Sequence, residues 1–235
     1  MSATILGLPF AGAQADPFQR VRAALPEEVR RDFRTHTYPG HGRRAAEPFA
    51  STVAAMADDV VATTRSDPPV HLVGWSMGGA VAYEVAARLM DAASPVASVT
   101  FLACAPPPEL ATDGLDLGTD DLLLDHCEQF GLVDRTMFAD AGLRRLFLPA
   151  LRNDIAAVDR YAREDRRGLL ADMTSVAVVQ GSADRTVTTS ADWSSVGGRV
   201  VLQRTLAGGH FFPQDQPQEL ASLWSEFLLT TTTAR

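Results

Sequence analysis

Short runs of apolar, often β-branched residues alternate along the chain with amphipathic segments. The apolar runs predict strands at Thr4–Leu8, Asp32–Tyr38, Val70–Gly74, Val96–Ala103, Ser175–Gln180 and Arg199–Thr205. Apolar residues at helical spacing predict helices at Pro17–Ala24, Phe49–Arg65, Met77–Leu89 and Gln216–Leu228. Strands that alternate with helices are typical of α/β proteins, whose sheets are mostly parallel. We therefore predict an α/β fold with a mostly parallel central sheet flanked by helices.

The middle of the chain, residues 107–172, lacks this alternation and is predicted to be helical without a strand. Apolar residues recur there at helical spacing, namely Leu143, Phe147, Leu151, Ile155, Val158 and Ala162. Pro149 is expected to begin a second helix, because proline suits a first turn and not a helix interior. A helical insert between two core strands indicates a lid over a site, and a peripheral helical layer fits the same periodicity. We divide the chain into a core, residues 1–106 and 173–235, and a helical lid insertion, residues 107–172.

Composition narrows the possible functions. The net charge is −8, which argues against nucleic acid as a partner, since its binding draws heavily on lysine and arginine. Every one of the 21 basic residues is arginine, so a Schiff-base or P-loop lysine is excluded. Cys104 and Cys127 are too few for a zinc framework, and we expect both to be reduced. No metal or organic cofactor is implied.

The chain shows no signal for export or for a membrane. Met1–Leu8 lacks the basic n-region and the long apolar stretch of a secretory signal. No apolar segment approaches the roughly 20 residues that span a bilayer. We expect a cytoplasmic protein of one large domain that acts as a monomer without a membrane partner.

A candidate nucleophile lies between the third predicted strand and the helix that follows. Gly74–Gly78 fits the pattern G-x-S-x-G, which alone is weak, because roughly one chain of this length in ten carries it by chance. A strand before and a helix after are the context of a nucleophile elbow, with Ser76 on a strained turn. The Met77 N–H, at the helix N-terminus, then faces a developing oxyanion. The alternative is a glycine-rich turn in which Ser76 only caps the helix.

A serine nucleophile needs a base and an orienting acid, which follow it in the order Ser, Asp or Glu, His in this fold. His210 is the candidate base, because it lies late in the chain in a glycine-rich loop just after a strand. The other histidines lie earlier, at His36, His41, His71 and His126. Asp184 is the candidate acid, since it follows a strand and projects from the carboxyl edge of the sheet. Asp192 is its nearest rival, and a turn-forming role is the alternative for Asp184.

A second oxyanion donor is expected in the loop after the first strand, Leu8–Ala13. The Ala11 N–H is our candidate, because small residues there let the backbone approach the substrate. The amide of the neighbouring residue is the alternative.

Four segments together resemble the type II thioesterases in order and spacing. They are Pro9–Gly12, Tyr38–Arg43, Gly74–Gly79 and Gly208–Phe212, and Leu151–Ile155 resembles that family's lid. The resemblance covers nearly the whole chain. These enzymes are stand-alone α/β-hydrolases that accompany polyketide and nonribosomal peptide synthases. They remove stalled or wrong acyl groups from the phosphopantetheine arm of carrier proteins.

The resemblance implies an α/β-hydrolase fold with a helical lid, and acyl or peptidyl carrier proteins as partners. It implies a triad of Ser76, Asp184 and His210, with Met77 and Ala11 as backbone oxyanion donors. Two departures are expected to reshape the pocket. Trp75 stands where the family often has histidine, and Ala103–Pro108 stands where it more often has basic residues followed by Ala-Pro-His.

Other functions fit the same residues. An esterase or lactonase acting on small molecules, or an acyltransferase, would use the same triad. A non-catalytic carrier-binding module is disfavoured by the complete triad. A local excess of arginine in the insert and at its exit is a candidate carrier-docking surface, and a solvated helix face is the alternative. These arginines are Arg144, Arg145, Arg152, Arg163, Arg166 and Arg167.

Overall fold

The computed structural model describes residues 4–64, 69–92, 94, 96–110, 118–164, 170–187 and 191–233. Its centre is a six-stranded sheet in the order β2-β1-β3-β4-β5-β6, with all neighbouring strands parallel. The strands are β1 Thr4–Leu8, β2 Phe33–Thr35, β3 Val70–Trp75, β4 Val96–Leu102, β5 Leu170–Gly181 and β6 Gly197–Leu206. The predicted α/β architecture is confirmed.

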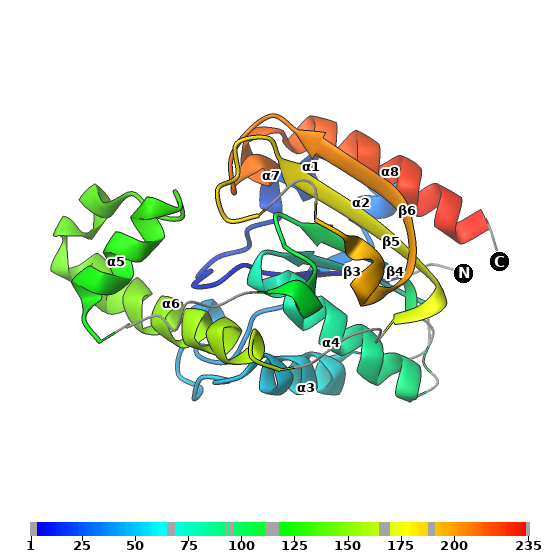
Figure 1. Ribbon diagram of the computed structural model, residues 1–235. Helices are drawn as coiled ribbons and strands as arrows, with labels where there is room; N and C mark the ends of the chain where they lie inside the picture. Colours follow the sequence, from blue (N-terminus) through cyan, green and yellow to red (C-terminus); the bar gives the residue numbers. More distant parts are fainter. Residues whose placement is uncertain are drawn as a thin grey trace.

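Helices cover both faces of the sheet (Figure 1). On one face lie α1 Gln19–Ala24, α2 Glu27–Arg30, α7 Phe212–Asp215 and α8 Pro217–Thr233. On the other lie α3 Val53–Thr63 and α4 Met77–Asp91. Short 3₁₀ turns complete the connections at η1 Gly42–Arg44, η2 Pro107–Glu109, η3 Arg135–Ala139 and η4 Trp193–Val196.

The central strand β3 is buried along its whole length, because helices pack on both of its faces. Leu72 belongs to the core cluster beneath α3 and α4, together with Met56 and Tyr83. Trp75 belongs to the cluster on the opposite face, together with Phe227 of α8. Burial on both faces explains why the core strands read as nearly continuous apolar runs.

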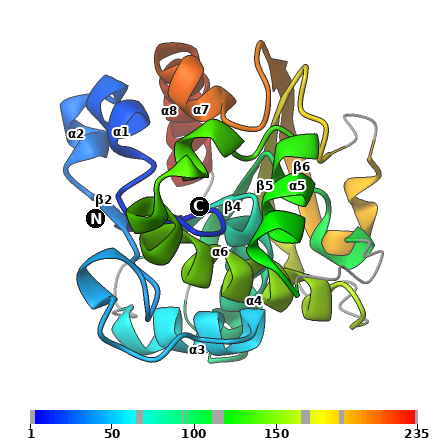
Figure 2. The ribbon, with the colours of Figure 1, turned by 90° about the vertical axis from the view of Figure 1, so that its left-hand side faces the viewer.

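In the described part of the insert, the α-helices are α5 Asp120–Gln129 and α6 Ala141–Tyr161, which lie at the carboxyl edge of the sheet (Figure 2). Pro149 lies inside α6, so the expectation that it begins a second helix is wrong. The buried side chains on either side of it, Leu148 and Leu151, explain why the helix continues, since their packing outweighs the lost backbone hydrogen bond. Strand β5 begins at Leu170, so the predicted boundary between residues 172 and 173 falls inside a strand.

Other element ends also differ from the predicted ones. Strand β2 ends at Thr35 instead of Tyr38, where the chain leaves the sheet edge for a loop. Helix α3 begins at Val53 instead of Phe49, because the Thr52 hydroxyl caps it by accepting the Ala55 N–H at 3.0 Å. Its predicted end at Arg65 lies outside the described residues. In the part of the chain that is described, no helix has both the length and the apolar character to cross a membrane.

Candidate active site

Ser76 lies in the sharp turn between β3 and α4, with φ 55° and ψ −119°. A positive φ is strained for any residue with a side chain, and such strain clusters at functional sites. A Cβ on Gly74 would lie 2.2 Å from the Gly78 carbonyl oxygen, and one on Gly78 would lie 2.0 Å from the Leu8 oxygen. Both glycines are therefore required for the helix to pass the strands so closely. Ser76 makes no side-chain capping bond to α4, which removes the alternative of a capping serine.

Asp184 and His210 form a buried pair in the loops that follow β5 and β6. His210 Nδ1 lies 2.9 Å from Asp184 Oδ2, and the Asp184 side chain is fully buried. Burial by itself raises the pKa of Asp184, but the His210 hydrogen bond and charge, with hydrogen bonds from Thr186, hold the pKa below its usual value. The rival Asp192 instead accepts the Ser194 N–H at the start of η4, at 2.9 Å.

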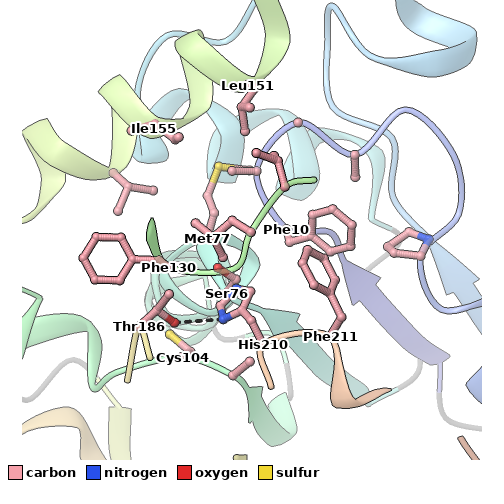
Figure 3. Close-up of a pocket in the computed structure, with 18 of the residues that line it drawn as sticks. Phe10, Ser76, Met77, Cys104, Phe130, Leu151, Ile155, Thr186, His210 and Phe211 are labelled. Carbon is pink, nitrogen blue, oxygen red and sulfur yellow. Dashed lines mark hydrogen bonds between the residues drawn. The ribbon is translucent and has the colours of Figure 1, made fainter. Parts of the chain in front are cut away.

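Thr186 contacts both members of this pair, and its role was not predicted from the sequence. Its hydroxyl donates to Asp184 Oδ1 at 2.7 Å and lies 2.8 Å from His210 Nδ1, as the dashed line in Figure 3 shows. Its backbone N–H donates to the same Oδ1 at 2.8 Å. A proton on Nδ1 then serves both acceptors and leaves Nε2 as the basic nitrogen of the ring. The signal in the sequence was the Asp-x-Thr spacing of a side-chain turn.

Two backbone amides are available to an oxyanion. Met77 is the first residue of α4, Ala11 follows β1, and both line the same cavity as Ser76. Neither amide donates a hydrogen bond within the part of the chain that the structure describes. The neighbouring Gly12 N–H is engaged, because it donates to Asp154 Oδ2 at 2.8 Å. The geometry therefore favours Ala11 over Gly12.

Trp75 is hydrogen-bonded to the loop that carries His210. It is fully buried, and its Nε1–H donates to the His210 carbonyl oxygen at 3.1 Å. Its ring packs edge-on against Phe10 and Phe211, with centroids 4.8 and 5.8 Å away. Those two phenylalanines line the cavity, whereas Trp75 does not. Trp75 therefore does not line the pocket itself, and an influence on the pocket's shape would pass through Phe10 and Phe211.

The cavity above Ser76 measures about 660 Å³, within the range of ligand pockets. Its floor holds Ser76 and His210, and Leu151 and Ile155 of α6 lie above them (Figure 3). Further apolar residues of the insert line it, including Phe130, Phe147 and Val158. The insert therefore covers the site and is not a peripheral layer.

The second departure from the family pattern lies inside the cavity. Ala103, Cys104 and Ala105 all line it, and Ala103 has a positive φ of 45°. Burial and the nearby Asp184 charge raise the pKa of the Cys104 thiol to about 12. Cys104 is therefore uncharged near neutral pH and is not a competing nucleophile. The described residues hold no cluster of histidine, cysteine and carboxylate side chains suited to a metal ion.

The arginines of the insert are largely occupied by its own carboxylates. Arg144 and Arg152 pair with Asp121 and Asp120 of α5. Arg163, just after the end of α6, pairs with Asp159 of that helix at 2.7 Å. Arg166 and Arg167 lie outside the described residues. The local basic excess predicted from the sequence is thus reduced by neighbouring acids.

Known proteins resemble this chain over nearly its full length. The family model described as "Thioesterase domain" matches residues 3–228. Thioesterase PikA5 of Streptomyces venezuelae is 30% identical over 230 residues, which cover 95% of this chain and 80% of that protein. The structure of BorB, a type II thioesterase from the borrelidin biosynthetic cluster, has a TM-score of 0.78 at 26% identity, covering 97% and 93% of the two chains. ClbQ from the colibactin pathway, at 19% identity, shares the fold with a TM-score of 0.85 over both full chains.

Proposed function

Because the chain belongs to the thioesterase-domain family, we propose that it is a stand-alone type II thioesterase. It hydrolyses acyl groups from the phosphopantetheine arm of acyl or peptidyl carrier proteins in polyketide or nonribosomal peptide synthesis. The observation that carries the proposal is the strained Ser76 beside the buried Asp184–His210 pair, on the floor of a covered apolar cavity.

In the proposed mechanism, His210 Nε2 takes the Ser76 proton while Ser76 Oγ attacks the thioester carbonyl carbon. The Met77 and Ala11 amides hold the oxyanion, each contributing about 3–4 kcal/mol by comparison with other acyl-transfer sites. The C–S bond then breaks, and His210 returns the proton to the departing sulfur. Asp184 keeps the proton on Nδ1 and stabilises the imidazolium without taking it up.

Water completes the cycle. His210 removes a proton from a water molecule, the hydroxide attacks the acyl-Ser76 carbonyl, and Ser76 leaves with a proton from His210. The thiol of the arm has a pKa of about 8.5 by analogy with cysteine, so it departs more easily than an alkoxide. The substrate brings its own phosphopantetheine group, and the proposed chemistry needs no metal or cofactor.

The covered cavity supports an acyl substrate. Side chains of the insert, such as Phe147, Ile155 and Val158, give it an apolar lining. An acyl chain bound against them places its carbonyl at Ser76 and keeps bulk water from the apolar part of the chain. We further propose that the enzyme works as a cytoplasmic monomer.

The test compares wild type with Ser76→Ala on a panel of acyl groups loaded on a holo-carrier protein. Ser222→Ala, an exposed serine on α8, is the matched control. Free acid should form with wild type and the control and should be absent with Ser76→Ala, because the alanine has no nucleophile. Substantial turnover by Ser76→Ala would overturn the assignment.

The same panel separates the alternatives. Faster cleavage of the matching oxygen esters than of the carrier thioesters would indicate an esterase or lactonase. Acyl transfer to an added amine or alcohol in preference to water would indicate an acyltransferase.

A further inference from the structure

Three segments of the chain meet at one buried carboxylate, that of Asp154 on α6. This side chain is fully buried, and its Oδ2 accepts the Gly12 N–H at 2.8 Å. The same oxygen lies 2.9 Å from His41 Nε2, and Oδ1 accepts the Asn153 side-chain amide at 3.0 Å. Asp154 thus joins the lid helix to the loop after β1 and to the loop that carries His41, which lies 113 residues away.

His41 is the buried side-chain partner of this carboxylate. Its Nδ1 lies 3.0 Å from the Pro39 carbonyl oxygen, so each ring nitrogen lies within hydrogen-bond distance of an oxygen, an arrangement that favours the doubly protonated imidazole. Burial by itself lowers the pKa of His41, but the hydrogen bond and charge of Asp154 outweigh it and raise the pKa. A buried charge without a partner is costly, so each member of the pair requires the other.

The loop after β1 is held by contacts on two sides. Gly12 has φ 77°, and a Cβ there would lie 3.1 Å from Leu151 Cβ, so α6 packs directly on the loop backbone. Leu151 and Asp154 are three residues apart and share one face of the helix. On the other side, Gly78 of the elbow packs against the Leu8 and Pro9 carbonyl oxygens. Phe10 and Ala11 lie between these two contacts.

We propose that Asp154, held by His41, is a positioning residue that fixes the loop after β1 so that the Ala11 amide faces the oxyanion. This inference rests on the proposed function, since it takes Ala11 as an oxyanion donor. It follows that the oxyanion site is complete only while α6 is seated on the loop.

A fluorophosphonate with a short alkyl group tests the positioning role of Asp154 without a thioester substrate. Its phosphoryl oxygen uses the same amides when the phosphorus reacts with the serine hydroxyl and fluoride leaves. In Asp154→Asn the inactivation rate constant kinact should fall about tenfold to hundredfold, less than the roughly 10²–10³ lost with a whole donor. The inhibition constant KI should change little. The control Asp120→Asn, which breaks only a surface pair within the lid, should react like wild type.

A second pair of variants keeps the test decisive if Asp154→Asn does not fold. His41→Gln retains a donor near Nε2 and should keep most of the wild-type kinact, whereas His41→Leu should lose it. Equal kinact for folded Asp154→Asn and wild type, or for His41→Gln and His41→Leu, would overturn the positioning role. Thermal unfolding at the assay pH identifies the folded variants. Failure of wild type to react would instead count against Ser76 as nucleophile, and so against the proposed function.

Discussion

Replacing Thr186 by valine removes one hydroxyl group from the buried Asp184–His210 pair and leaves the shape of the side chain nearly unchanged. Two contacts of that hydroxyl are lost, the bond donated to Asp184 Oδ1 at 2.7 Å and the 2.8 Å contact with His210 Nδ1. The Asp184–His210 bond and the Thr186 N–H bond to Oδ1 remain. The substitution thus loosens the imidazole without removing any group that reacts.

The size of the effect follows from these contacts. A hydrogen bond to a charged group contributes about 1.5–3 kcal/mol when its partner is buried, as Asp184 is. Each 1.4 kcal/mol added to the activation free energy lowers the rate roughly tenfold. Complete loss of this hydrogen-bond energy would therefore lower kcat about ten- to a hundredfold. Because two of the restraints on Asp184 and His210 persist, we expect the lower end, a fall of about tenfold in kcat.

The assay is steady-state hydrolysis of one acyl-carrier thioester by wild type, Thr186→Val and Thr186→Ser. Serine keeps the hydroxyl, so Thr186→Ser should stay within about threefold of wild type, while KM changes little in either variant because Thr186 acts on His210. Equal kcat for Thr186→Val and wild type would refute the reasoning. So would an equal loss in Thr186→Ser, which would assign the effect to the methyl group.

Two further changes test the packing and the electrostatics. Gly78→Ala should lower the free energy of unfolding by about 3 kcal/mol or more in chemical denaturation, because its Cβ meets backbone at 2.0 Å. Gly131→Ala is the control: it has φ 70° and open space around it, and should cost only about 1–2 kcal/mol. The stability difference between wild type and His41→Gln should be largest below pH about 6.5 and should shrink as the pH rises, since a raised folded-state pKa stabilises only the protonated form. Tyr38, whose ring packs against His41, has a pKa well above this range and does not titrate here. A stability difference that grows with pH would contradict the assignment.

The proposed nucleophile and base were accessible from the sequence because their signals are local. Ser76 is identified by glycines two residues away and by a strand and a helix beside it, and His210 by its place late in the chain. The Asp154–His41 contact has no such signal, because it joins residues 113 positions apart and exists only once α6 is seated.

The errors have a similar cause. The periodicity of the insert was visible, but a local rule for proline placed a helix start at Pro149, and burial of the neighbouring leucines outweighed that rule. Trp75 was noticed as unusual, yet its role depends on a hydrogen bond to a carbonyl oxygen 135 residues later. Patterns of neighbouring residues carry little information about such contacts.

The lid has a small apolar cluster of its own, separate from the two clusters that flank the sheet. Leu151 is a buried member of that cluster, Phe147 packs against it, and both also line the cavity. A substitution that enlarges the cavity at either residue therefore removes packing from the lid as well. Substitutions at Leu151 and Phe147 that admit bulkier acyl groups are therefore constrained by the need to keep the lid folded. Ala105 lines the cavity but belongs to none of the three clusters, so substitution there is less constrained. Divergence of acyl preference among close relatives should then concentrate on the sheet side of the cavity.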